Sequence, residues 1–118
     1  MQLGNLERSI MEALWRQPQG VFAHDLAAGL PSRPAVTTVL TVLMRLTNKG
    51  MVSRERVGRA HLYKATESKD VLVAETMRAA LDEAGDVVAA VQRFVGTVTP
   101  EVAAALREAL EGQSGSTR

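Results

Sequence analysis

Cysteine is absent from the 118 residues, and aromatic residues make up only 3% of them. Without cysteine the chain has no disulfide, no thiolate metal ligand and no cysteine nucleophile, and a reducing compartment, the cytoplasm, is expected. So few aromatic side chains argue against a surface that stacks RNA bases. Apolar runs are short, and the first ten residues, MQLGNLERSI, lack the basic start and apolar core of a signal peptide, so we expect neither membrane insertion nor export.

Motifs of catalysis and metal binding are also missing. The sequence has no glycine-rich phosphate loop, no nucleophile elbow and no pair of acidic residues at a catalytic spacing. Its two histidines, His24 and His61, have no second histidine or cysteine near them, which favours surface or capping roles over metal ligation. We therefore predict no enzyme, no cofactor and no metal site.

The net charge of +1 hides an uneven distribution along the chain. Between residues 33 and 64 the basic side chains outnumber the acidic ones by seven to one, whereas the segments on either side are acidic on balance. A concentrated positive segment attracts an anionic partner, although any one of these residues alone could be a solubilising surface charge. The seven are Arg33, Arg45, Lys49, Arg54, Arg56, Arg59 and Lys64.

Apolar periodicity predicts three helices followed by a β-hairpin. The helices are expected at 3–15, 23–30 and 35–49, with Pro34 at the first helical position of the third and Gly50 as its left-handed terminator. Val21-Phe22 is too short for more than a single β-bridge. From 51 to 64 the period changes to two around Gly58-Arg59, which predicts two antiparallel strands. This order predicts a mainly α fold with a small β-hairpin wing (α+β), a winged helix-turn-helix.

The third predicted helix has an unusual solvent face. Thr37, Thr41 and Arg45 recur at one-turn intervals opposite its apolar side, with Thr38 beside them, where a solvated helix normally carries Glu or Lys. Slim side chains with a hydroxyl and a methyl group suit base edges in a major groove, although a solvated helix with incidental threonines is the alternative. The predicted DNA-binding residues are these three threonines and the seven basic residues, with the hairpin arginines on phosphates.

Three short helices are expected between residues 67 and 112, beginning near Ser68, Asp86 and Thr99-Pro100. Such a short helical segment buries too little surface for a core of its own, which predicts that it forms a homodimer interface. We therefore divide the chain into a DNA-binding domain (1–66), a dimerisation region (67–112) and a disordered tail (113–118). The predicted interface residues are Leu72, Met77, Leu81, Val88, Val91, Phe94, Val102, Leu106 and Leu110.

Several motifs together resemble the BlaI/MecI/CopY family of penicillinase-type transcriptional repressors. They are LERSIMEALW at 6–15, Thr37-Thr38-Val39 with Thr41-Val42-Leu43, Arg45-Leu46 with Lys49-Gly50, and Arg59 with Tyr63. The resemblance covers most of the chain. It implies a dimeric repressor whose winged helices bind a near-palindromic operator in double-stranded DNA and whose C-terminal helices form the dimer interface.

The resemblance also implies a route of regulation. In the penicillinase branch a membrane sensor with a zinc metalloprotease domain responds to β-lactam signals, and the repressor is cleaved before a Phe of the second C-terminal helix. The matching bond is Arg93-Phe94, where Arg stands in place of the usual Asn. The copper-responsive branch uses C-terminal cysteines, which this chain lacks. The alternative function is a winged-helix protein-interaction module whose basic hairpin binds an acidic protein.

Overall fold

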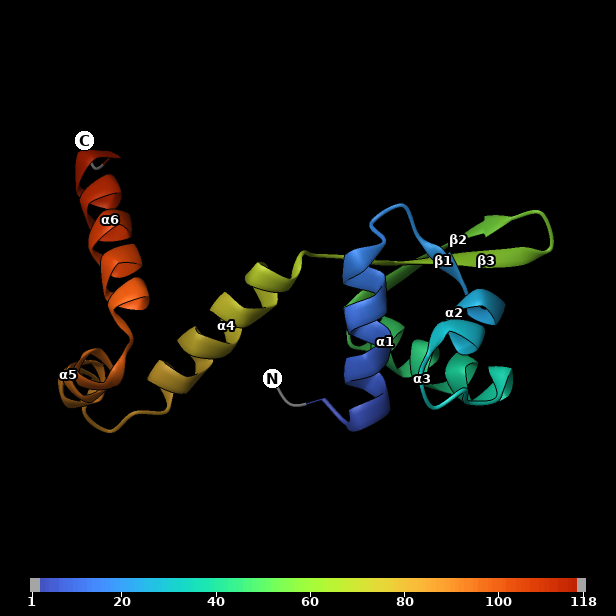
Figure 1. Cartoon of the computed structure of the whole chain (residues 1–118), viewed down its shortest axis with the longest axis horizontal. Coiled ribbons are helices and arrows are strands. Elements are labelled where there is room, and N and C mark those ends of the chain that lie inside the picture. The colour runs from blue at the N-terminus through green and yellow to red at the C-terminus, as the bar shows by residue number, and fades with distance from the viewer. Residues whose placement is uncertain (1–2, 117–118) are drawn as a thin grey trace. The chain divides into compact units, whose positions relative to one another are not determined.

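The computed structural model describes residues 3–116, with side chains described for residues 3–113. The chain forms two compact units, of which the first runs to Thr76 and the second begins at Met77. The first unit contains α1 (Asn5–Arg16), β1 (Val21–Phe22), α2 (Ala23–Gly29), α3 (Val36–Asn48), β2 (Val52–Val57), β3 (Ala60–Ala65) and the start of α4 (Lys69–Asp82). The second contains the rest of α4, α5 (Val87–Thr97) and α6 (Pro100–Ser116) (Figure 1).

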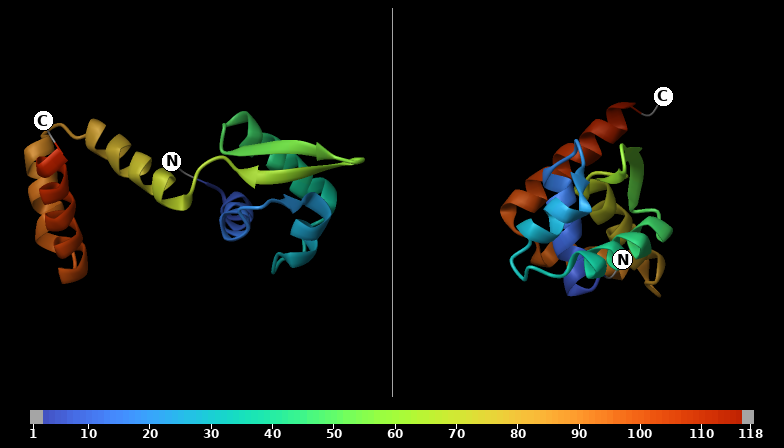
Figure 2. Two further views of the ribbon diagram at one scale, coloured as in Figure 1. Left: turned by 90° about the horizontal axis from the view of Figure 1, so that it is seen from above. Right: turned by 90° about the vertical axis from the view of Figure 1, so that its right-hand side faces the viewer.

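The first unit is a three-helix cluster with a small antiparallel sheet in the order β1-β3-β2. Val57 pairs with Ala60, so Gly58 and Arg59 form a two-residue turn, and the φ of +64° at Gly58 fits the first position of a type II′ hairpin turn. The predicted winged helix-turn-helix of the α+β class is confirmed. The hairpin tip projects beyond α2 and α3 (Figure 1 and Figure 2).

β1 makes more than the single bridge predicted for it. Val21 pairs with Tyr63 and Phe22 pairs with Leu62, so the sheet has a third strand. The prediction is wrong because Gly20, with a φ of +107°, turns the chain onto β3. A Cβ at Gly20 would lie 2.7 Å from Cγ of Leu62, so only glycine allows this close approach.

The core lies between α1, α2, α3 and the sheet. Its largest fully buried side chains are Ile10, Met11, Leu14, Val39, Leu43 and Leu46. Tyr63 is also buried, so its ring packs inward from the wing. Gly50 ends α3 with a φ of +80°, which confirms the predicted left-handed terminator.

α3 begins later than predicted. Ala35 is extended (ψ 147°) and is the residue before the first helical residue, Val36. Pro34 therefore precedes the helix, and its assignment to the first helical position is wrong. The preceding turn contains Arg33 in the left-handed region (φ +47°).

The caps of the second unit confirm two predicted helix starts. A side-chain oxygen of Asp86 accepts a hydrogen bond from the backbone N–H of Ala89 (3.1 Å), and the hydroxyl of Thr99 accepts one from Val102 (3.2 Å). The predicted helix end at Gly112 is wrong, because α6 continues to Ser116. The proposed tail is therefore helical as far as residue 116, and residues 117–118 lie outside the described part. A glycine inside a helix costs only about 1 kcal/mol relative to alanine and does not by itself stop the helix.

The start of α4 packs onto the first unit. Nε1 of Trp15 donates a hydrogen bond to the carbonyl oxygen of Glu67 (3.1 Å), Nζ of Lys69 lies 2.8 Å from a carboxylate oxygen of Glu12, and Leu72 is partly buried against the core. These contacts carry the first unit past the boundary predicted at residue 66. Among the helices of residues 3–116, none combines the length and the apolar character that a bilayer crossing requires.

Candidate nucleic-acid interface

One side of α3 is buried in the core and the other side is open to solvent. Val39, Val42, Leu43 and Leu46 are buried. All four residues predicted to read bases are exposed: Thr37, Thr38, Thr41 and Arg45. The hydroxyl of Thr41 donates a hydrogen bond to the carbonyl oxygen of Thr37 (3.0 Å), which leaves its oxygen as an acceptor and its methyl group free to contact a partner.

The same open face carries two apolar residues that were not predicted as site residues. Leu40 is 40% exposed and Met44 is 61% exposed. The sequence could have identified them as exposed, because neither residue falls on the apolar side of the helix formed by Val39, Leu43 and Leu46. The open face of α3 is therefore a mixture of threonine, arginine and two large apolar side chains.

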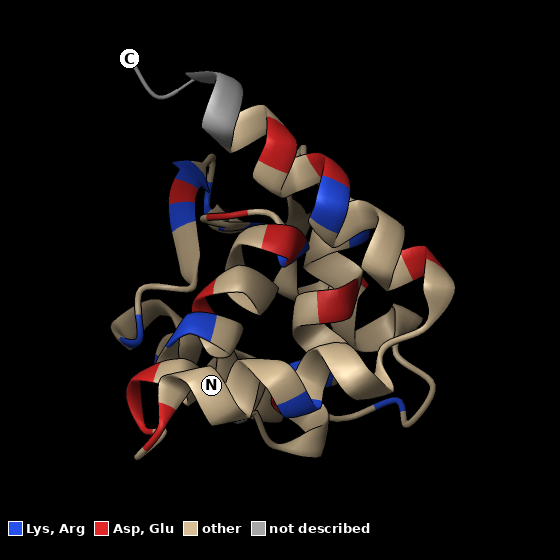
Figure 3. Ribbon diagram, turned by 90° about the vertical axis from the view of Figure 1, so that its left-hand side faces the viewer, with Lys and Arg blue, Asp and Glu red and all other residues tan. Residues whose placement is uncertain are grey.

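The wing presents the hairpin arginines. Arg54, Arg56 and Arg59 are all exposed, and Nε of Arg56 donates a hydrogen bond to the carbonyl oxygen of Gly58 (3.2 Å), which fixes this side chain at the turn. Figure 3 marks the charged positions along the ribbon. Lys64 of β3 forms an ion pair with Glu55 of β2 (3.2 Å) between exposed side chains, so its charge is partly balanced within the wing.

Lys49 differs from the other predicted DNA-binding residues because it pairs with a buried carboxylate. Its Nζ lies 3.0 Å from Oε2 of Glu7, a buried carboxylate whose other oxygen accepts a hydrogen bond from the backbone N–H of Gly4 (3.0 Å). The Gly4 hydrogen bond, followed by that of Lys49, lowers the pKa of Glu7. Lys49 therefore joins the end of α3 to the start of α1. Arg33 lies exposed in the turn between α2 and α3, and its contact with DNA stays a prediction.

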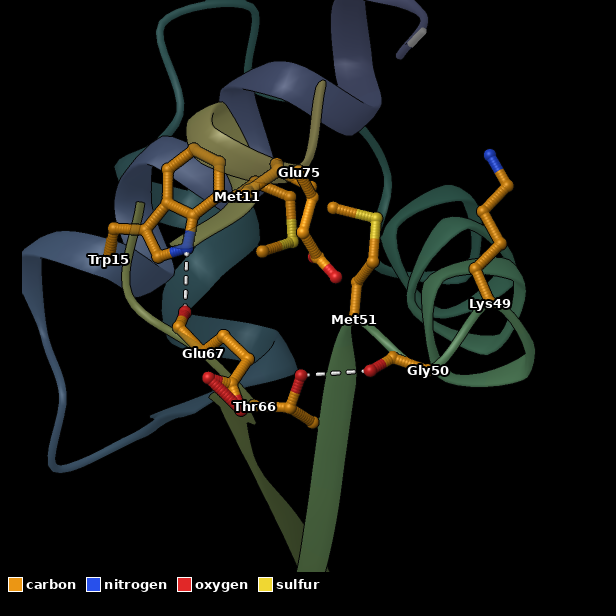
Figure 4. Close-up of a pocket in the computed structure, with 9 residues that line it drawn as sticks. Met11, Trp15, Lys49, Gly50, Met51, Thr66, Glu67 and Glu75 are labelled. Carbon is orange, nitrogen blue, oxygen red and sulfur yellow. Dashed lines mark hydrogen bonds between the residues drawn. The ribbon is translucent and has the colours of Figure 1, made fainter. Parts of the chain in front are cut away.

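A cavity of about 370 Å³ lies where β3 leads into α4. Met11 and Trp15 from α1, Met51 before β2 and Glu75 from α4 surround it, whereas the side chain of Lys49 extends away from it (Figure 4). Two hydrogen bonds join residues that line it: Nε1 of Trp15 donates to the carbonyl oxygen of Glu67, and the hydroxyl of Thr66 donates to the carbonyl oxygen of Gly50 (2.8 Å). Leu72 lines this cavity, so this member of the predicted dimer interface packs within the first unit.

The remaining predicted interface residues lie on helices that bury almost nothing. No residue of α4 or α5 is buried in the described chain. Leu106 is half-buried and the others are exposed: Met77, Leu81, Val88, Val91, Phe94, Val102 and Leu110. Three more apolar residues that were not predicted share this exposure, namely Val73, Val87 and Val95. The predicted cleavage site, Arg93 and Phe94, lies inside α5 with both side chains exposed.

The described residues contain no group of three or more potential metal ligands. Instead, a helix whose open face carries threonines, an arginine and two apolar side chains stands beside a basic hairpin on a compact three-helix cluster, the arrangement of winged-helix DNA-binding proteins.

Comparison with known proteins identifies the family. The sequence model of the penicillinase repressor family matches residues 3–112, and the chain belongs to this family. The transcriptional regulator BlaI of Mycobacterium tuberculosis is 40% identical over 114 residues, which cover 92% of this chain and 83% of that protein. The resemblance found in the sequence is confirmed. Because the family and this relative are transcriptional regulators, the chain is a regulator and not an enzyme.

Solved structures share the fold. The DNA-binding domain of the repressor BlaI, determined in solution, superposes with a TM-score of 0.52 at 23% identity and covers 58% of this chain and 84% of that chain. A MarR-family transcriptional regulator from Rhodococcus sp. RHA1 gives the same TM-score of 0.52, again at 23% identity, over 98% of this chain and 76% of that chain. At this level of identity the likeness concerns the fold alone.

Proposed function

We propose that the protein is a dimeric transcriptional repressor that acts in the cytoplasm by binding a near-palindromic DNA operator. In this proposal α3 enters the major groove, where Thr37, Thr38, Thr41 and Arg45 contact bases. The wing lies along the backbone, where Arg54, Arg56 and Arg59 contact phosphates. Family membership supports the repressor role.

The observation that carries the proposal is the open face of α3 beside the wing. Four exposed residues that can hydrogen-bond to base edges occur on one helix, and the neighbouring hairpin supplies exposed guanidinium groups. Guanidinium and hydroxyl groups are among the donors that proteins use on DNA phosphates and bases. Lys49 and Lys64 are the weakest members of the predicted set, because each forms an ion pair within the chain.

We further propose that the second unit holds two copies together. Its helices expose Met77, Leu81, Val88, Phe94 and other large apolar side chains, and a second copy would cover them. A two-fold symmetric dimer presents two α3 helices to two half-sites related by the same symmetry. The near-palindromic operator follows from this symmetry.

Release from the operator belongs to the same proposal. Cleavage between Arg93 and Phe94 would divide α5, and the two halves could no longer present one continuous apolar face to the partner. A membrane sensor metalloprotease would supply the signal. Because a helix must unwind before a protease can cleave it, this bond requires local opening of α5.

The proposal is tested by incubating the purified protein with fragmented genomic DNA from its source, at near-physiological salt and with competitor DNA, and by sequencing the retained fragments. We expect enrichment of one or a few inverted repeats. A protein-interaction module with a basic hairpin would instead retain fragments without sequence preference and lose them as salt rises. That outcome would overturn the repressor function.

A further inference from the structure

The two apolar side chains on the open face of α3 are placed where a polar surface is expected. Leu40 and Met44 lie one helical turn apart, so their side chains are neighbours on the helix. Single exposed apolar residues need no explanation, but two adjacent ones among threonines and an arginine form a patch.

The patch opens into a groove between α3 and the wing. The groove has a volume of about 400 Å³ and is lined by Leu40, Met44, Thr47, Asn48, Arg54 and Tyr63. Of these lining residues, Tyr63 is buried and Arg54 is exposed. The surface is therefore apolar at Leu40 and Met44 and positively charged at its wing side, with the exposed Arg45 also on α3.

We propose that Leu40 and Met44 recognise the methyl groups of thymine bases, and that these two residues set part of the sequence preference of this protein. The inference rests on the proposed function, in which α3 occupies a major groove. An occupant of this surface must present apolar groups next to negative charge. Duplex DNA does so: the C5 methyl group of thymine is the apolar group at the base edges of the major groove, and phosphates flank it.

Methionine suits this task at position 44. Its unbranched side chain has three rotatable bonds and a polarisable sulfur, so it can adjust to a methyl group whose position varies with DNA shape. Leu40 is stiffer, and it lines the same groove as Met44 and Arg54. In the proposed complex, Arg54 would contact a phosphate and Leu40 would contact a methyl group beside this same groove.

The test uses a duplex that the wild-type protein selects from a random-sequence library. Each thymine of one half-site is replaced in turn by uracil, which lacks only the methyl group, and the Kd is measured for the wild type, Leu40→Asn and Met44→Gln. Met44→Leu is the matched control because it stays apolar. Thermal unfolding of all variants checks that the fold is retained, which the exposure of both residues favours.

We expect uracil at one or more positions to weaken wild-type binding by about fourfold for each buried methyl group. Met44→Gln or Leu40→Asn should weaken binding to the thymine duplex by a similar factor and should no longer respond to uracil at that position. Met44→Leu should retain the response.

The outcomes separate this inference from the proposed function. If the wild-type protein selects no duplex, the proposed function and the inference are both overturned. If it selects a duplex but no uracil weakens binding, the proposed function stands and the inference is wrong. The inference is also wrong if the polar variants keep the full uracil effect, because another group would then contact the methyl.

Discussion

Gly20 fixes the position of β1 through a single backbone conformation. Its φ of +107° is unfavourable for any residue with a side chain, and a Cβ there would meet Leu62 at 2.7 Å and Lys64 at 3.1 Å. We expect Gly20→Ala to lower the free energy of unfolding by about 1–3 kcal/mol through backbone strain, with a further loss from the contact with Leu62. Chemical denaturation of the isolated protein measures this. Gly29→Ala is the control, since no heavy atom lies within 4 Å of a Cβ at Gly29, and it should not destabilise.

The buried carboxylate of Glu7 makes stability depend on pH. Hydrogen bonds from Gly4 and Lys49 lower its pKa below the ordinary value of 4.5, so the folded state binds this proton less readily than the unfolded state. Its contribution is therefore present above about pH 4.5 and is lost as the pH falls through the lowered pKa. We expect Glu7→Gln to cost about 1–3 kcal/mol at pH 7 and progressively less below pH 4.5.

Denaturation of wild type and Glu7→Gln between pH 3 and pH 7 measures this difference. The control is Glu12→Gln, which removes the more exposed ion pair with Lys69 and should cost less than about 1 kcal/mol. A Glu7→Gln penalty that stayed constant across this range would show that the carboxylate charge is not the source of the stability.

At the scale of elements, local signals were sufficient for most of the fold. The turn at Gly58-Arg59, the terminator Gly50 and the caps Asp86 and Thr99 each act within a few residues, and each is confirmed. The predictions that are wrong concern elements set by distant contacts, or places where a local signal is too weak to decide the structure. β1 depends on a contact between residues 20 and 62, and Gly112 carries a stop signal that the rest of α6 overrides.

The same distinction holds for the candidate site. Periodicity correctly placed Thr37, Thr38, Thr41 and Arg45 on the exposed side of α3. It could not show that Lys49 pairs with Glu7, because those residues are 42 positions apart. Spacing alone predicts Leu72 in the dimer interface, whereas packing places it against the core of the first unit.

α3 and the wing should respond differently to loss of an arginine. Arg45→Ala removes a group that can form two hydrogen bonds with one guanine, so we expect a loss of about 1–3 kcal/mol in operator affinity and relaxed selectivity at one base position. Binding of the variant to the selected operator and to all single-base variants of it measures both effects. If affinity and selectivity are unchanged, Arg45 does not contact a base.

Arg59→Ala tests the wing. Because the hairpin arginines are expected on phosphates, binding should weaken on every sequence alike, and the slope of log K against log salt should become shallower by about one unit. Titrations at several salt concentrations, on the operator and on an unrelated duplex, measure this. Arg16→Ala, a change at the end of α1 outside the proposed interface, should leave the slope as it is. A loss confined to one base position would assign Arg59 to base reading instead.

For the whole molecule, the proposed dimer makes operator affinity depend on the second unit, although that unit contacts no DNA in the proposal. Leu81 belongs to a row of exposed apolar residues on α4, with Val73 and Met77 at intervals of one turn. If a second copy covers this row, Leu81→Glu places an unpaired charge in the interface and should yield monomers by analytical ultracentrifugation. Each monomer keeps one α3 helix and binds one half-site, so operator binding should fall steeply while the α-helical circular dichroism of the first unit persists.

Ala79→Glu adds the same charge to an exposed position of the same helix outside this row and should remain dimeric. If Leu81→Glu stays fully dimeric, the copies associate through another face, and the apolar row on α4 has a different occupant.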